Sequence, residues 1–229
     1  MSFVFPAALN VSVEIANSND RFPVRRVYCV GRNYAAHARE MGMDEREAPF
    51  FFTKFADTVV PSGSNIAYPP STTDFQYEGE LVIAIGREAT NVTVADAIDH
   101  VFGYACGLDM TRRDLQLVAR EKGRPWDMGK NFSEAAVVAP ILPISAMGVN
   151  LAGKMLKLRV NGETKQESDL SLLIWSCAEI IAELSRYDTL MPGDLIFTGT
   201  PAGVGPVTPG DRMELTIDGL PKLSATVKS

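Results

Sequence analysis

The stretch YEGELVIAIG at residues 77–86 decides the fold: it is an apolar, β-branched run with two carboxylates at its entrance. As a strand it alternates between two faces with a period of two, so Glu78 and Glu80 share a face, and both faces are apolar from Leu81 onward. A strand covered on both sides holds its first residues close to the interior. Two neighbouring carboxylates are costly there unless protons or a cation compensate them. The stretch therefore predicts a buried strand that begins at a cation site.

A hard divalent cation suits such a site, because Mg²⁺ takes oxygen ligands in near-octahedral geometry and keeps waters or substrate oxygens in its remaining positions. Asp109 ends another apolar run, residues 101–109, where a third oxygen ligand could meet the two glutamates. Both features have a plainer interpretation. Glu-x-Glu is common on solvated strand faces, and Asp109 could be the N-cap of a following helix. Spacing alone leaves these alternatives open.

The length of 229 residues suits one large domain, and we expect a short arm at 1–22 followed by a single domain at 23–229. Hydrophobic residues at 46% and charged residues at 22% are typical of soluble globular proteins, and no apolar run reaches the ~20 residues of a membrane span. With 22 basic and 28 acidic residues the net charge is −6, which argues against a nucleic-acid partner. Composition therefore favours a soluble protein without nucleic-acid or membrane partners.

The cysteines Cys29, Cys106 and Cys177 lie far apart in apolar settings, without the C-x-x-C spacing of a zinc or redox site. They are expected to be small buried hydrophobic residues rather than a disulfide framework. The first residues lack a basic region, and their apolar stretch is broken at Pro6, so they do not resemble a secretion signal. These features together predict a protein of the reducing cytoplasm.

Many short strands with few helices are expected along the rest of the chain. Strands are predicted at 11–15, 27–30, 50–52, 101–109 and 195–197, and two hairpin turns at Asn161-Gly162 and Asp218-Gly219. Helices are predicted at 34–41, from a Thr93 cap through His100, and at 172–184. A further helical segment contains Arg112, Arg113 and Gln116.

His37 and Glu40 are three residues apart on a predicted helix, so they share a face. A histidine oriented by a carboxylate is the usual general base for water, although a plain surface pair is the alternative. His100 lies at a helix-to-strand junction without a nearby ordered acid, and we expect it to be structural. Lys54 and Lys130 each follow a hydrophobic stretch and are either surface lysines or part of a site for an anionic substrate.

Five motifs in the same order resemble the fumarylacetoacetate hydrolase superfamily and span nearly all of the chain past Arg26. They are VGRNYAAHARE at 30–40, YEGEL at 77–81, GLDMT at 107–111 with Asp114 and Gln116, WDMGK at 126–130, and TGTPAGVG at 198–205. Within the superfamily, PFFF at 49–52 leading to Lys54, together with GRPW at 123–126, most resembles the acylpyruvate hydrolases, the fumarylpyruvate hydrolases in particular. Two positions depart from the usual pattern: Ser133 follows Asn131-Phe132 in place of aspartate, and Phe55 follows Lys54 in place of proline.

The resemblance implies an α+β, mainly β fold with few short helices, a mixed β-sandwich or rolled sheet of the fumarylacetoacetate hydrolase C-terminal domain type. It implies a homodimer and a Mg²⁺ or Mn²⁺ ion, with Ca²⁺ as a substitute in a crystal, held by Glu78, Glu80 and Asp109. His37 and Glu40 would lie on a mobile lid that closes over substrate, and Lys130 would act in catalysis. The substrate-binding residues implied are Arg32, Lys54, Arg112, Arg113, Gln116 and Thr200.

The implied activity is metal-dependent hydrolysis of the C–C bond of a 2,4-diketo acid, with fumarylpyruvate and water giving fumarate and pyruvate. This is a step suited to the catabolism of aromatic compounds. The metal would chelate the α-keto acid end, His37 would take a proton from water, and Lys130 would help to stabilise the pyruvate enolate. The alternatives are an oxaloacetate decarboxylase or a 2-hydroxyhepta-2,4-diene-1,7-dioate isomerase-type activity at the same site, and a catalytically silent metal-binding dimer.

Overall fold

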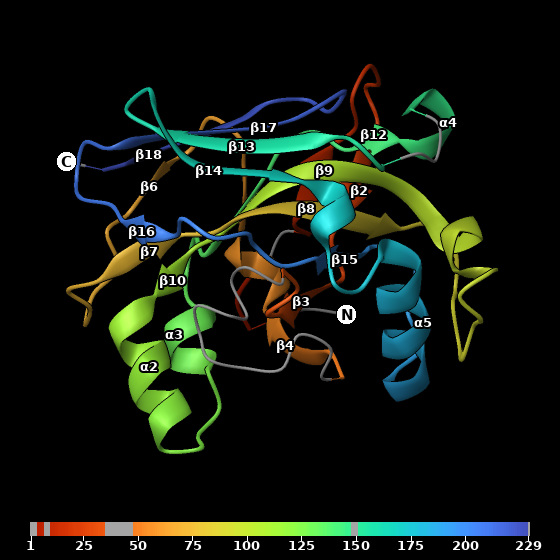
Figure 1. Cartoon of the computed structure of the whole chain (residues 1–229), viewed down its shortest axis with the longest axis horizontal. Helices are drawn as coiled ribbons and strands as arrows, with labels where there is room; N and C mark the ends of the chain where they lie inside the picture. The colour runs from red at the N-terminus through yellow and green to blue at the C-terminus, as the bar shows by residue number, and fades with distance from the viewer. Residues whose placement is uncertain (1–3, 7–9, 35–47, 148–150, 229) are drawn as a thin grey trace.

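Two packed β-sheets make up most of the molecule (Figure 1). The computed structural model describes residues 4–6, 10–34, 48–147 and 151–228. The larger, eight-stranded sheet has the order β4 (Phe50–Lys54), β3 (Arg26–Gly31), β15 (Asp194–Phe197), β8 (Gly79–Ile85), β9 (Val101–Asp109), β11 (Ala136–Val138) and β5 (Val59–Pro61), with β12 (Leu142–Pro143) paired to β9. The five-stranded sheet has the order β14 (Glu163–Asp169), β13 (Met155–Val160), β17 (Arg212–Ile217), β18 (Leu223–Val227) and β6 (Asn65–Ile66).

Smaller elements complete the fold, and the described helices are few and short. A three-stranded sheet has the order β10 (Thr111–Arg112), β7 (Phe75–Tyr77) and β16 (Gly205–Pro206), and a two-stranded one pairs β1 (Ser12–Glu14) with β2 (Arg21–Pro23). The helices are η1 (Ala56–Thr58), η2 (Ala97–His100), α2 (Arg113–Glu121), α3 (Asp127–Lys130), α4 (Ile144–Met147), η3 (Leu170–Leu172) and α5 (Cys177–Tyr187). The expected mainly β fold with few short helices is confirmed.

Strand β8 lies inside the larger sheet, and every one of its residues is buried. It pairs antiparallel with β15 on one side and with β9 on the other. Leu81 belongs to the core between the two sheets, whereas Val82 belongs to a second core on the opposite face, together with Val13 of β1 and Phe22 of β2. The N-terminal hairpin thus helps to cover the far face of the sheet. The predicted strand with two apolar faces is confirmed.

The turn at Asn161-Gly162 forms as expected. Both residues have positive φ, 51° and 83°, and they connect β13 to β14. At the second predicted turn Gly219 also has positive φ, 79°, but β17 ends at Ile217 and β18 begins only at Leu223. The second connection is therefore longer than the two-residue loop expected from Asp218-Gly219.

Two predicted helix starts are wrong. Helix α5 begins at Cys177 rather than near residue 172, because Ser176 and Glu179 form a reciprocal capping box. The preceding apolar residues form η3 instead. Thr93 Oγ accepts a hydrogen bond from the Asp96 N–H, but this closes a turn, and the short helix begins only at Ala97. The helix expected at 34–41 falls almost wholly in 35–47, outside the described residues.

All three cysteines are buried and unpaired, as expected. Burial raises the pKa of the Cys106 and Cys177 thiols to about 12, so both stay protonated near neutral pH. Among the described residues, no helix combines the length and the apolar character needed to cross a bilayer.

Candidate active site

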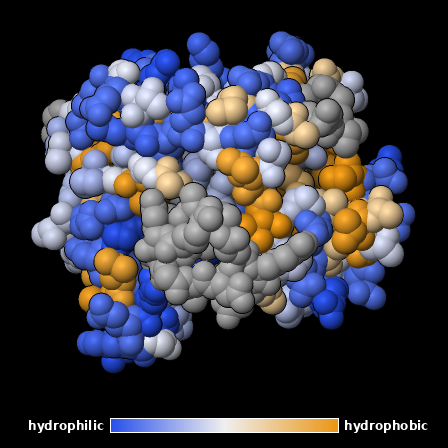
Figure 2. All heavy atoms as spheres, in the orientation of Figure 1, coloured by the Kyte–Doolittle hydropathy of each residue, from blue (hydrophilic) through white to orange (hydrophobic). Residues whose placement is uncertain are grey.

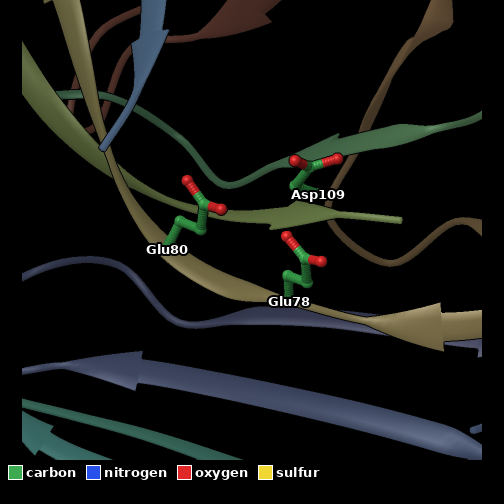
Figure 3. Close-up of side chains that lie close together, drawn as sticks. All are labelled: Glu78, Glu80 and Asp109. Atoms are coloured by element: carbon green, nitrogen blue, oxygen red, sulfur yellow. The ribbon is translucent and has the colours of Figure 1, made fainter. Parts of the chain in front are cut away.

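Three buried carboxylates meet at the junction of β8 and β9 (Figure 3). Glu78 directly precedes β8, Glu80 is its second residue, and Asp109 is the last residue of β9. Each offers an oxygen atom, and these atoms all lie within 4.8 Å of one another. The antiparallel register creates this junction, because it places the start of β8 beside the end of β9, with Glu80 opposite Gly107.

The structure excludes the alternative that Asp109 is the N-cap of the following helix. Helix α2 begins at Arg113 with Arg112 as its N-cap residue, so Asp109 does not cap it. Instead the Asp109 N–H donates to the Glu78 carbonyl at 2.9 Å, and the Asp109 side chain joins those of the two glutamates. The expected third carboxylate is therefore in the cluster.

Lys130 brings a buried positive charge to two of the carboxylates. Its Nζ donates to Glu78 Oε2, Asp109 Oδ2 and Thr111 Oγ1, each at 2.8 Å, and the residue is only 2% exposed. Burial lowers the pKa of Lys130, but the charges of Asp109 and Glu78 raise it by more, so its net pKa lies above the usual value. Lys130 is therefore an ammonium held between two carboxylates.

Lys54 and Arg113 supply the other cations. Lys54 Nζ lies 2.8 Å from Asp109 Oδ1 and donates to the carbonyl oxygens of Met110, at 3.2 Å, and Lys130. Arg113 Nη2 donates to Glu78 Oε1 at 2.5 Å. Burial raises the pKa of Glu78, but Lys130 and Arg113 lower it by more, so this carboxyl is ionised.

Glu80 differs from the other two carboxylates because no described residue forms an ion pair with it. It is 2% exposed, and its Oε2 accepts a hydrogen bond from the Gly199 N–H at 2.7 Å. Burial together with the charges of Asp109 and Glu78 raises its pKa well above the usual range. Asp109 Oδ1, by contrast, is buried against the Lys54 ammonium at 2.8 Å. Glu80 is thus the one carboxylate of the three without a cation beside it among the described residues, and a divalent cation held by the three oxygen atoms would supply that missing partner.

A cavity opens beside the cluster. Its lining includes Glu78, Glu80 and Lys130, and also Val30, Gly31, Arg32, Phe52, Arg113, Gln116, Leu117, Arg120, Trp126 and Thr200. Four of the six predicted substrate-binding residues are therefore part of the cavity wall: Arg32, Arg113, Gln116 and Thr200. Lys54 and Arg112 are not. The Arg112 guanidinium lies 4.5 Å above the Phe132 ring, where burial lowers its pKa.

Arg32 is held in an unusual conformation at this wall. Its φ of 61° is in the left-handed region, which few residues other than glycine adopt. Its guanidinium lies 5.3 Å from the Phe50 ring centre and 6.0 Å from that of Trp126. His37 and Glu40, the predicted base and its partner, follow within 35–47 and lie outside the described residues.

Two buried amides that support the site were not predicted. Asn33 Nδ2 donates to the carbonyls of Trp175, at 2.9 Å, and Thr198, at 2.8 Å. Gln166 of β14 contacts both Gly79 and Thr200. The only sequence signal for Gln166 is its inward position in the strand alternation. Asn33 is part of the motif at 30–40, but that motif does not indicate these hydrogen bonds.

The chain is similar to known proteins over nearly its full length. The model of the family described as "Fumarylacetoacetate (FAA) hydrolase C-terminal" matches residues 26–228. A fumarylpyruvate hydrolase of Ralstonia sp is 51% identical over 181 residues, which are 79% of this chain and 93% of that protein. The mitochondrial oxaloacetate tautomerase FAHD1 of Homo sapiens is 40% identical over 204 residues, 89% of this chain and 92% of that protein.

Among solved structures, the fold matches that of fumarylpyruvate hydrolase from Pseudomonas aeruginosa in complex with Mn²⁺ and pyruvate. The TM-score is 0.96 at 53% identity, and the match covers 99% of both chains. The carboxylate cluster, the two-sheet fold and these similarities lead to one assignment: the chain belongs to the fumarylacetoacetate hydrolase family.

Proposed function

We propose that this protein is a metal-dependent hydrolase that cleaves the C–C bond of a 2,4-diketo acid, with fumarylpyruvate and water giving fumarate and pyruvate. The observation that carries the proposal is the buried cluster of Glu78, Glu80 and Asp109, in which Glu80 has no ion-pair partner among the described residues, beside a cavity walled by cationic side chains. Similarity at 51% and 53% identity to fumarylpyruvate hydrolases supports the substrate.

In this proposal the three carboxylates hold a divalent cation, Mn²⁺ or Mg²⁺. Their hard oxygen atoms suit either ion, and the similar Pseudomonas aeruginosa structure contains Mn²⁺ together with pyruvate. When bound, the ion supplies Lewis acidity toward the α-keto acid end of the substrate.

The cationic side chains of the cavity provide the rest of the electrostatics. Cleavage leaves the pyruvate fragment as an enolate, and the ammonium of Lys130, already charged and buried, is suited to stabilise that negative charge. Arg113, Gln116, Arg32 and Thr200 would bind the substrate from the cavity wall. Lys54 would fix the Asp109 carboxylate rather than meet the substrate.

A base must also take a proton from the attacking water. The sequence prediction assigns this role to His37, oriented by Glu40, and it stays a prediction because both residues lie outside the described part of the chain. Water then adds to the distal carbonyl carbon, the C–C bond breaks, and the enolate takes up a proton to give pyruvate.

A second function is favoured by the similarity at 40% identity to a protein named oxaloacetate tautomerase. Such an activity, like the decarboxylase and isomerase alternatives, needs the enolate-stabilising site but no attacking water. The deciding experiment is a spectrophotometric assay of fumarylpyruvate, acetylpyruvate and oxaloacetate in parallel, with Mn²⁺, with Mg²⁺ and with a chelator. Metal-dependent cleavage that prefers fumarylpyruvate supports the proposal. Conversion of oxaloacetate alone would replace it with the second function.

We also propose how the protein assembles and where in the cell it is located. Figure 2 shows apolar side chains gathered over η3 and the segment that leads into α5, and Leu172 in η3 is 59% exposed. A grouped apolar surface of this kind is typical of an interface, so we propose that residues 23–229 form one domain that pairs with a second copy through this region. The three buried free thiols support a reducing, cytoplasmic location.

A further inference from the structure

The Gln166 side chain extends from the five-stranded sheet to the backbone beside the carboxylate cluster. It lies on β14, the first strand of the five-stranded sheet order, yet it is only 1% exposed. Its Oε1 accepts a hydrogen bond from the Gly79 N–H at 2.9 Å. Gly79 is the residue between Glu78 and Glu80. A Cβ atom added at Gly79 would lie 3.1 Å from that same oxygen, so the glycine allows the amide to approach this closely.

The other end of the same amide holds Thr200. Gln166 Nε2 donates to Thr200 Oγ1 and to the Pro201 carbonyl, both at 2.8 Å. Thr200 Oγ1 in turn donates to the Gly79 carbonyl at 3.0 Å. The result is a closed ring of hydrogen bonds from Gly79 to Gln166, to Thr200 and back to Gly79.

This ring fixes two parts of the site at once. Both the N–H and the carbonyl of Gly79 are engaged, so the backbone that separates the two glutamate ligands cannot rotate without breaking a buried hydrogen bond. Because Gln166 donates into Thr200 and the Thr200 hydroxyl donates to Gly79, the proton of that hydroxyl is committed to the protein. Thr200 therefore offers the cavity a lone pair rather than a proton.

We infer that Gln166 is a positioning residue of the active site, which sets the spacing of the Glu78 and Glu80 carboxylates and orients the Thr200 hydroxyl as a hydrogen-bond acceptor. The group that meets Thr200 in the cavity is then a donor, such as a water molecule or the enol hydroxyl of a 2,4-diketo acid. The consequence for turnover rests on the proposed function, whereas the consequence for metal affinity does not.

Two substitutions separate the two halves of this role in the full chain. Gln166→Met removes the acceptor and both donors at similar length. Gln166→Glu keeps an acceptor for the Gly79 N–H but, even when protonated, has a single donor and cannot serve both Thr200 and the Pro201 carbonyl. The matched control is Glu167→Gln on the same strand, because the Glu167 side chain is 49% exposed and pairs with Lys157 at the surface.

We expect Gln166→Met to weaken Mn²⁺ binding and to lower kcat, each roughly 10–100-fold, as is typical when a residue behind a metal ligand is lost. Gln166→Glu should retain most of the Mn²⁺ affinity but lower kcat, and the control should change neither. Calorimetric titration with Mn²⁺ and steady-state kinetics at saturating Mn²⁺ measure the two effects separately. If Gln166 only supported the fold, both variants would lower the melting temperature, and Gln166→Glu would not lower kcat while keeping the Mn²⁺ affinity.

Folded Gln166 variants with the Mn²⁺ affinity and kcat of the wild type would overturn the inference. If the variants do not fold, a measurement on the wild type tests the same inference. Mg²⁺ should shift the NMR signals of the Gly79 amide and of the Gln166 side-chain amide. If these signals did not move, the inference would equally be overturned. If the wild type cleaved no acylpyruvate, the proposed function would fail, while the Mn²⁺ affinities would still decide the role of Gln166.

Discussion

Lys130 and Asp109 form an ion pair of 2.8 Å that is almost completely shielded from solvent, with 2% and 1% of the two side chains exposed. The same ammonium compensates Glu78, so its removal leaves two buried carboxylates with fewer cations. Loss of one partner of a buried pair typically costs about 3–5 kcal/mol. We therefore expect Lys130→Met to destabilise the metal-free protein by about this amount, and added Mn²⁺ to restore part of the loss.

Thermal unfolding in a chelator and in excess Mn²⁺ measures this effect. Lys157→Met is the matched control, because Lys157 pairs with Glu167 at the surface, where such pairs contribute about 0–1 kcal/mol. If Lys130→Met and Lys157→Met were equally stable in the chelator, Lys130 would not be compensating the cluster.

Unlike the loss of Lys130, the loss of the Glu80 charge should not destabilise the metal-free protein, but it should abolish function. Its buried carboxylate has no ion-pair partner among the described residues, and glutamine can still accept the hydrogen bond from the Gly199 N–H. We expect Glu80→Gln to leave the metal-free protein as stable as the wild type or more stable, and to abolish Mn²⁺ binding and activity. Urea unfolding in a chelator and calorimetric Mn²⁺ titration test both halves. Retained Mn²⁺ affinity would remove Glu80 from the ligand set.

The carboxylate cluster could be predicted from sequence because each part has a local signal. The apolar run after Glu80 identifies a covered strand, and a second apolar run ends in Asp109, so two acids at strand ends were visible without knowledge of the strand order. The pairing of β8 with β9 then brings them together. Ser176 and Glu179 have the spacing of a capping box, so the start of α5 could also have been predicted from sequence. The apolar residues before Ser176 continue the helical pattern, however, and this placed the predicted start too early.

The supporting residues could not be predicted, because their roles depend on contacts between distant segments. Gln166 and Gly79 are 87 residues apart in sequence, and Asn33 and Thr198 are 165 apart. The family resemblance places Lys54 in the site, but its local pattern suits a surface lysine equally well, and its contact with Asp109 depends on the packing of β4 near α3, which leaves it 2% exposed. A polar residue that acts through a neighbouring sheet leaves no periodic pattern of its own.

Asp114 gives a pH dependence of stability. Its carboxylate accepts hydrogen bonds from Thr72 Oγ at 2.6 Å, the Thr73 N–H at 2.9 Å and the Leu115 N–H at 2.9 Å. Burial raises its pKa, but these hydrogen bonds lower it by more, so the net pKa lies below the usual value of about 3.9. A pKa lowered in the folded state stabilises the protein above the unfolded-state pKa, and the stabilisation is lost as the pH falls through the folded-state pKa.

We therefore expect Asp114→Asn to lower the free energy of unfolding at pH 7 and to approach the wild type below about pH 4. Urea unfolding at a series of pH values from 7 to about 3 measures this convergence. A difference that stayed constant across the series would mean that the Asp114 charge does not contribute.

Leu172 tests the proposed homodimer. It is the last residue of η3 and is 59% exposed, and Figure 2 shows apolar side chains gathered over that element, so a charge there should disrupt an interface formed by this region. We expect Leu172→Lys to shift the molar mass in light scattering from dimer to monomer without loss of folding. Val118→Lys, at a 46% exposed position on α2 away from η3 (Figure 1), is the control and should stay dimeric. A monomeric wild type, or a dimeric Leu172→Lys, would contradict the proposed interface.

His37→Ala tests the assignment of the general base. General-base catalysis typically contributes a factor of about 10²–10⁴, so kcat for fumarylpyruvate should fall by this factor, while Mn²⁺ affinity stays near that of the wild type because the three carboxylates are intact. The chain has two histidines, and His100→Asn is therefore a natural control that should retain kcat. Oxaloacetate tautomerisation needs no attacking water, so a variant that lost hydrolysis but kept that reaction would assign His37 specifically to water activation. Unimpaired hydrolysis by His37→Ala would instead require a different base.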